Sequence, residues 1–190
     1  MDVAAFFNTV RARLGPLNQS QVDGFNIVLK ATDGQPLAHR AYTLATPWWE
    51  TKQTMQPVRE AYWLSEDWRR AHLRYFPWYG RGYVQLTWET NYTKAGILLA
   101  AGGVLQPGDL TANPELAMRP DVAAFVLRHG MDQGWFTGVS LAHVLPLTGT
   151  ATHDQYVNAR TIINGHDKAD NIEAIAQVFE RALRDGGYGL

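Results

Sequence analysis

Apolar residues recur at helical spacing through most of this chain, and glycine or proline interrupts each run. The first run ends at Gly15-Pro16, and its apolar positions are Val3, Phe6, Phe7, Val10 and Leu14. Runs of the same kind predict further helices over 20–32, 37–50, 65–73, 88–101, 121–129 and 172–185. A long loop with at most one turn is expected over 132–152, where glycine and proline recur. The pattern therefore predicts a mainly α-helical fold with little or no β-sheet.

The size and composition of the chain favour a single domain over 1–190. Of its 190 residues, 46% are hydrophobic and 18% are charged, which is enough apolar material for a sizeable core. Cysteine is absent, which excludes disulfides, thiolate catalysis and cysteine-bound zinc. Stability must therefore come from packing.

Charge and hydropathy limit the partners that we expect. The formal net charge is −1, and Arg69, Arg70 and Arg74 have acidic neighbours, so no nucleic-acid partner is expected. No apolar stretch of about 18 residues could span a membrane. The start, Met1-Asp2-Val3, lacks the features of a signal peptide, so we expect synthesis in the cytoplasm. We expect a monomer.

Two glutamates ten residues apart, Glu50 and Glu60, are candidates for acid–base chemistry. Hydrolysis of a glycosidic bond needs one protonated carboxyl group and a second, ionised one, about 5–9.5 Å away. In an unbroken helix the two would lie roughly 15 Å apart along the axis. Pro57 cannot continue a helix and biases Gln56 away from helical angles, so the chain is expected to turn back at this step. On spacing alone, solvated surface charges are the commoner explanation.

The residues around this pair resemble the family 19 glycoside hydrolases, the plant-type chitinases, and are more similar still to their bacterial and phage relatives among the lysozyme-like endolysins. The resemblance extends over most of the chain and implies a lysozyme-like, mainly α fold. The matching segments are 6–14, 19–24, 44–51, 55–62, 79–88, 91–92, 113–117 and 162–165.

The resemblance also implies roles for individual residues. Glu50 falls on the general acid, Glu60 on the general base and Thr87 on the hydroxyl residue that helps to hold the attacking water. Gln85 and Asn164 fall on sugar-binding positions. The implied reaction is inversion by direct attack of water, without a metal or other cofactor.

The strip from Tyr79 to Trp88 is expected to be extended and to face the substrate. Within it, Tyr79, Arg81, Tyr83 and Trp88 are candidates for contact with sugar, although core packing is the alternative for the aromatic residues. Gln85 and Thr87 alternate as residues on the same face of a strand do. Without the resemblance they would be ordinary strand polar groups, and Asn164-Gly165 would be an ordinary turn.

Three residues depart from the family pattern. Trp49 stands where the family usually has histidine, Lys52 where it has a small residue, and Pro47 lies in the helix expected to carry the acid. An internal proline typically costs about 3 kcal/mol, unless it opens a new turn with Thr46 as its cap. These departures predict weakened activity or an altered substrate preference.

The expected substrate is the β-1,4-linked amino-sugar backbone of bacterial peptidoglycan, and the expected place of action is the cell wall after release of the protein. A chitinase acting on N-acetylglucosamine polymers is the first alternative. A non-catalytic wall-binding protein with a degenerate site is the second. The histidines show no metal-ligand spacing, although His143, His153 and Asp154 leave a zinc amidase as a remote alternative.

Overall fold

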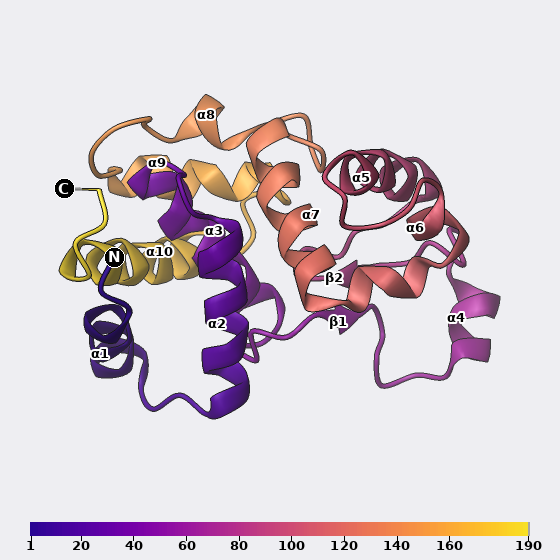
Figure 1. The fold of residues 1–190 in the computed structure, drawn as a ribbon, viewed down its shortest axis with the longest axis horizontal. Coiled ribbons are helices and arrows are strands. Elements are labelled where there is room, and N and C mark those ends of the chain that lie inside the picture. The colour runs from indigo at the N-terminus through magenta and orange to yellow at the C-terminus, as the bar shows by residue number, and fades with distance from the viewer. Residues whose placement is uncertain (190) are drawn as a thin grey trace.

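The computed structural model describes residues 1–189 and confirms a mainly helical fold (Figure 1). Six helices of 12 residues or more form most of the described chain: α1 (Val3–Leu14), α2 (Gln19–Ala31), α3 (Leu37–Glu50), α5 (Glu89–Ala101), α7 (Pro120–Gln133) and α10 (Ala169–Asp185). The shorter helices are α4 (Glu66–His72), α6 (Asp109–Ala112), η1 (Pro114–Met118), α8 (Leu141–Val144), α9 (His153–Ala159) and η2 (Arg160–Ile162). Strands β1 (Val58–Arg59) and β2 (Arg81–Gly82) form one small antiparallel sheet.

The helices that periodicity predicts are present, with small shifts at their ends. Helix α2 begins at Gln19, one residue before the expected start, and Asn18 caps it, because its side chain accepts a hydrogen bond from the backbone of Gln21. The single turn expected within 132–152 is α8. Helix α9 follows that loop and was not predicted.

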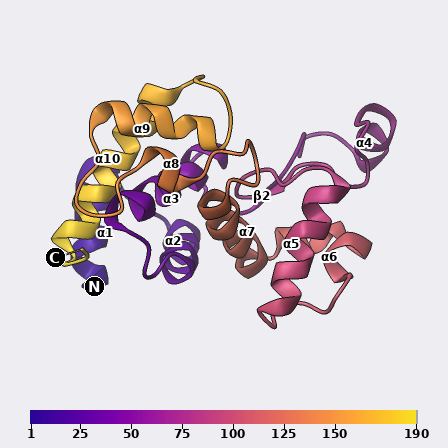
Figure 2. The ribbon, with the colours of Figure 1, turned by 90° about the horizontal axis from the view of Figure 1, so that it is seen from above.

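Helices α1, α3 and α10 pack together at one end of the molecule (Figures 1 and 2). Phe6, Trp48 and Phe179 from these helices meet Phe25 of α2, and ring centroids lie 5.5 Å apart for Phe25 and Trp48 and 5.4 Å apart for Phe25 and Phe179. All four side chains are buried. This aromatic cluster fixes the C-terminal turn of α3, and Glu50 follows Trp48 by two residues.

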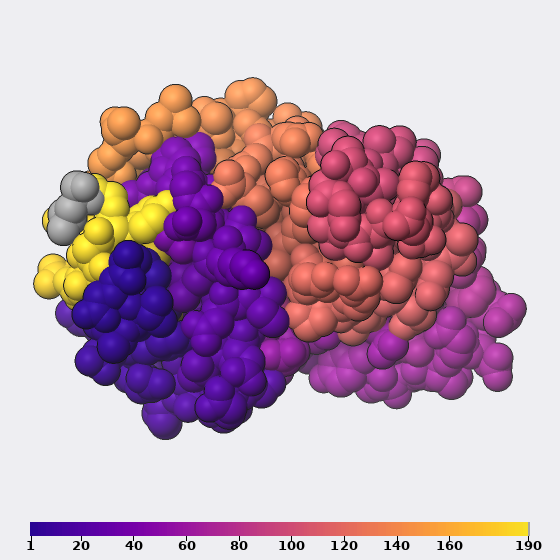
Figure 3. Space-filling model, viewed as in Figure 1, coloured from indigo at the N-terminus to yellow at the C-terminus, as the bar shows by residue number. Residues whose placement is uncertain are grey.

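Helices α4, α5 and α6 lie at the opposite end, beyond α7 (Figure 2). Helix α7 packs against α2 and also against α5, η1 and β2, so it joins the two ends. In the space-filling view the indigo N-terminal segment and the yellow segment of α10 accordingly lie on the opposite side from the segment around residue 100 (Figure 3). The segment between α3 and α5, which carries Glu60 and the small sheet, runs from the first end to the second.

Pro47 does not open a new turn. Helix α3 continues through it to Glu50, and Thr46 donates its hydroxyl to the Tyr42 carbonyl at 3.0 Å instead of capping a helix. The backbone N–H of Thr51 donates to the Pro47 carbonyl at 3.0 Å, so the last turn is closed. The proline removes one hydrogen bond, and the buried packing of Pro47 and Trp48 holds the helix together.

Within residues 1–189, no helix has the length and apolar character needed to cross a membrane.

Candidate functional site

The chain changes direction immediately after α3, earlier than the sequence predicts. Lys52, Gln53 and Met55 have positive φ angles of 52°, 68° and 54°, a region that non-glycine residues rarely adopt. The change of direction therefore begins over 51–55, ahead of the Gln56-Pro57 step where it was predicted, and the chain bends again at Gln56. Pro57 instead stands directly before β1.

Tertiary hydrogen bonds hold this unusual turn. The Met55 N–H donates to the Thr51 hydroxyl at 3.0 Å, and the buried Tyr83 hydroxyl donates to the Met55 carbonyl at 3.3 Å. From α2, the Gln21 amide donates to the Gln53 carbonyl at 2.9 Å. The backbone between the two candidate glutamates is thus fixed from several sides.

Glu50 forms an ion pair with Arg160, which the sequence analysis did not select. Arg160 Nη1 lies 2.6 Å from Glu50 Oε1, and the two side chains are 6% and 21% exposed, respectively. Arg160 also donates from Nε to the Asp167 carbonyl at 3.1 Å. Arg160 lies 110 residues from Glu50 along the chain, so no local sequence pattern links the two. The one feature of the sequence that could have pointed to Arg160 is its position four residues before Asn164.

A pocket of about 220 Å³ opens beside Glu50. Its lining residues come from the end of α3, the following turn, β1 and the loop beyond: Glu50, Thr51, Lys52, Thr54, Val58 and Tyr62. Val58 and Tyr62 flank Glu60 by two residues on either side. The Glu50 pocket therefore adjoins the segment that carries the second glutamate.

Glu60 is held at the edge of the small sheet. Its backbone N–H donates to the Gly80 carbonyl at 2.7 Å, continuing the pairing of Arg59 with Arg81. One carboxylate oxygen accepts the Gly80 N–H at 2.9 Å, and the other accepts the Tyr75 hydroxyl at 2.6 Å. Burial, and also the hydrogen bond to Glu60, raise the pKa of Tyr75 to about 12, so the phenol stays a donor. Both carboxylate oxygens are thereby oriented.

Gly80 is required by this arrangement. A Cβ atom there would lie 2.7 Å from Gln85 Oε1 and 3.1 Å from Glu60 Oε2. Only glycine lets the backbone approach both side chains at this distance.

Gln85 and Thr87 are half-buried, and Gln85 lies near Glu60 at Gly80, but the two do not alternate along a strand as expected. Backbone hydrogen bonds between Arg81 and Leu86 close a tight turn, and Gln85 lies in it with φ of 55°. The Gln85 amide donates to the Val58 carbonyl at 3.0 Å, and the Thr87 hydroxyl donates to the Gln85 carbonyl at 2.7 Å. The Thr87 oxygen therefore keeps lone pairs that could accept a hydrogen bond from water.

Tyr79, Arg81 and Tyr83 lie in the interior, and we do not carry them into the proposed glycan contacts. The two tyrosines have no exposed surface, and Arg81 is 2% exposed. Tyr79 donates its hydroxyl to Glu66 at 2.9 Å, and Tyr83 supports Met55. The strip folds into a compact turn whose aromatic residues pack inward, which is why the alternative of core packing holds for them.

Trp88 and Asn164 remain accessible. The Trp88 ring is 43% exposed and its centroid lies 5.0 Å from that of Tyr75, the residue that holds Glu60. Asn164 is exposed, and its backbone N–H donates to the Arg160 carbonyl at 3.0 Å. Trp88 thus contacts Tyr75, which holds Glu60, and Asn164 is hydrogen-bonded to Arg160, which pairs with Glu50.

Behind the sheet, Glu115 joins the two strands through their arginines. Its carboxylate accepts Arg59 Nε at 3.1 Å and Arg81 Nε at 2.8 Å. Burial by itself would raise the pKa of Glu115, but the hydrogen bonds from the two arginines outweigh it and the pKa is lowered.

We expect the free energy of unfolding of the Glu115→Gln variant to fall less than that of the parent as the pH is lowered. Because the folded-state pKa lies below the unfolded one, this carboxylate stabilises the fold above the unfolded pKa, near 4.5, and the gain is lost as pH falls through the folded pKa. Urea unfolding should show a larger gap between parent and variant at pH 6 than at pH 3. Glu89→Gln, at an exposed helix start, is the control. If the stability difference between parent and Glu89→Gln narrowed as much between pH 6 and pH 3, the role assigned to Glu115 would be contradicted.

The described residues contain no group of three or more histidine, aspartate or glutamate side chains that could hold a metal ion. His143 accepts the Ser140 N–H at 3.1 Å, and His153 lies 3.2 Å from Glu173. The amidase alternative receives no support from this geometry.

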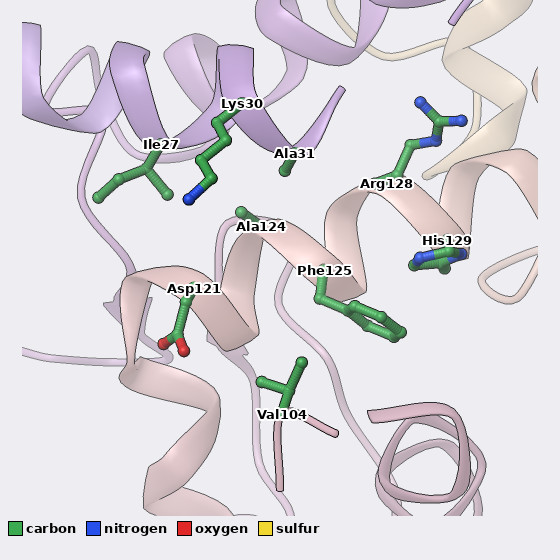
Figure 4. Close-up of a pocket in the computed structure, with 9 residues that line it drawn as sticks. All are labelled: Ile27, Lys30, Ala31, Val104, Asp121, Ala124, Phe125, Arg128 and His129. Atoms are coloured by element: carbon green, nitrogen blue, oxygen red, sulfur yellow. The ribbon is translucent and has the colours of Figure 1, made fainter. Parts of the chain in front are cut away.

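A larger hollow than the Glu50 pocket lies elsewhere, between α2 and α7 (Figure 4). Its volume is about 360 Å³, and it contains neither candidate glutamate. In this view Lys30 of α2 points toward α7, whereas Asp121 and Phe125 of α7 point toward Val104. The lining residues are Ile27, Lys30, Ala31, Val104, Asp121, Ala124, Phe125, Arg128 and His129. Its lining is largely apolar, and we assign it no catalytic role.

The fold is that of the family 19 chitinases. Chitinase C from Streptomyces griseus HUT6037 matches with a TM-score of 0.55 at 20% identity, covering 97% of this chain and 76% of that chain. A bacterial family 19 chitinase matches with a TM-score of 0.50 at 21% identity, covering 97% and 94%, respectively. No protein-family model and no curated protein matches the sequence. The mainly α, lysozyme-like fold that the resemblance implied is thereby confirmed.

Proposed function

We propose that the protein is a glycoside hydrolase that cleaves β-1,4 bonds between amino sugars of bacterial peptidoglycan, with inversion. The observation that carries this proposal is the pair of oriented, solvent-accessible carboxylates, Glu50 and Glu60, on either side of β1. Support also comes from the chitinase-type fold, which the named relatives use to act on a polymer of the same linkage.

In the proposed reaction Glu50 is the acid. Arg160 occupies Oε1 of Glu50, so Oε2 is the oxygen that would carry the proton. That proton passes to the glycosidic oxygen as the bond to the anomeric carbon breaks, and the leaving sugar departs as an alcohol.

Glu60 is the base in this scheme. It takes a proton from a water molecule, whose oxygen forms the new bond at the anomeric carbon from the opposite face. Tyr75 and Gly80 each use one lone pair of the carboxylate, which leaves others to accept the water. Thr87 assists in holding that water, and Gln85, Trp88 and Asn164 are the proposed sugar contacts.

Two alternatives rest on particular observations. The matching structures are those of chitinases, which favours action on chitin. Pro47 within α3 and the ion pair of Glu50 favour a wall-binding protein without activity.

We propose that the protein acts on the bacterial cell wall after its release from the cytoplasm.

Reducing-end assays on purified sacculi and on chitin distinguish the three. We expect release from sacculi at a kcat/KM at least about tenfold above that on chitin, corresponding to about 1.4 kcal/mol. The opposite ranking would favour the chitinase. Binding to sacculi without release from either polymer would favour the inactive wall-binding protein.

A further inference from the structure

Two exposed aromatic rings, Tyr62 and Trp63, stand at the mouth of the Glu50 pocket. They are 58% and 67% exposed, and they meet edge to face with centroids 5.1 Å apart. Tyr62 lines the pocket itself. Large apolar side chains that remain this exposed next to a pocket commonly mark a binding surface. Their flat faces suit the apolar face of a sugar ring.

Lys52 places a positive charge over these rings. Its ammonium lies 5.8 Å from the centroid of Tyr62 and 5.8 Å from that of Trp63, within the range of cation–π attraction. Its backbone belongs to the hydrogen-bonded turn after α3, with φ of 52°, so the side chain leaves a fixed position. Lys52 also lines the Glu50 pocket.

The charge of Lys52 has no carboxylate partner within residues 1–189. The ion pairs of the structure include none to Lys52, and the carboxylate that shares its pocket, Glu50, pairs with Arg160. Arg160 pairs with Glu50, so Lys52 is a cation of the pocket lining that has no carboxylate of its own among the described residues. An exposed cation of this kind attracts an anionic ligand over about one Debye length.

We propose that Lys52 is a specificity-determining residue that selects anionic glycans, with Tyr62 and Trp63 as the stacking surface beside it. Peptidoglycan carries carboxylates on the peptides attached to its sugars, whereas chitin is neutral and its deacetylated form is cationic. The ammonium would pair with a peptide carboxylate while the adjacent sugar lies against the rings. This inference rests on the proposed function and names the feature by which the same site prefers cell wall.

A purely structural role for Lys52 makes a different prediction. If the ammonium only held the two rings in place, its loss would weaken binding of every glycan equally and independently of salt. Charge selection instead requires an effect limited to anionic glycans and removed by salt.

The test uses co-sedimentation and kcat/KM with sacculi, sacculi whose carboxyl groups are converted to amides, and chitin. The variants are Lys52→Met, Lys52→Arg and, as matched control, Lys94→Met. Lys94 also lies over an aromatic ring, with its ammonium 5.4 Å from the Trp135 centroid, but it does not line the Glu50 pocket. At about 0.01 M salt, Lys52→Met should lose about two- to fivefold on sacculi only. Lys52→Arg should retain the parental value, and the loss should vanish at about 1 M salt.

The affinity of the parent protein for amidated sacculi should be as low as the affinity of Lys52→Met for ordinary sacculi. Equal losses on sacculi and chitin, a loss insensitive to salt, or the same loss in Lys94→Met would overturn the proposal. The proposed function would survive that result as long as the parent still releases reducing ends. If no reducing ends are released, co-sedimentation still decides the role of Lys52.

Discussion

Replacing either glutamate with glutamine will lower kcat on sacculi by about 10²- to 10⁴-fold, the usual contribution of general acid–base catalysis. Glu60→Gln preserves shape, but its single amide oxygen can accept a hydrogen bond from only one of Tyr75 and Gly80, and it cannot take a proton from water. Glu50→Gln cannot donate a proton to the glycosidic oxygen. KM should change little, because neither substitution removes a sugar contact.

Stability must be measured beside these rates. Glu50→Gln leaves Arg160, 6% exposed, without its anionic partner, and an uncompensated buried charge destabilises a protein. Rates are therefore compared at a temperature where every variant is folded. Glu89→Gln, at the start of α5, is the matched control and should keep the parental rate. Parental kcat in both glutamate variants would end the assignment.

The sequence predicts the helices well because each apolar run is local. The run from Leu37 to Trp48 packs on one aromatic cluster, and its end places Glu50 at the end of a helix as expected. Pro47 was harder to interpret, since a helix tolerates it here only through burial that the local sequence does not report.

The partners of the glutamates depend on tertiary contacts. Arg160 reaches Glu50 from a turn 110 residues away, and Tyr75 reaches Glu60 across 15 residues. Neither pair has a spacing that a local pattern could reveal. The family resemblance selected Glu50 and Glu60 themselves but said nothing of these two partners.

The turn after α3 shows why the reversal was misplaced. Lys52, Gln53 and Met55 have no intrinsic preference for the left-handed region, so sequence alone directs attention to Pro57. Hydrogen bonds from Thr51 and Tyr83 stabilise the turn instead. The same inward packing buries Tyr83, which a glycine-rich aromatic strip suggested would meet substrate.

The close approach of α2 to this turn leads to the second large effect, that of Gly24→Ala. A Cβ atom at Gly24 would lie 2.0 Å from the Met55 carbonyl oxygen and 2.8 Å from Met55 Cβ, so backbone must move. Alanine favours a helix by about 1 kcal/mol over glycine, yet the clash should reverse the sign.

We expect Gly24→Ala to lose about 3 kcal/mol of unfolding free energy, at the upper end for an overpacked site. Activity should fall with it, since the displaced turn joins Glu50 to β1. Gly96→Ala in α5 is the matched control, because its nearest neighbour, Leu110 Cβ, is at 3.4 Å, and it should be neutral or stabilising. Urea unfolding of the three proteins decides the matter: if Gly24→Ala is as stable as Gly96→Ala, α2 does not press on the Met55 turn, and the support described for the candidate carboxylates is incorrect.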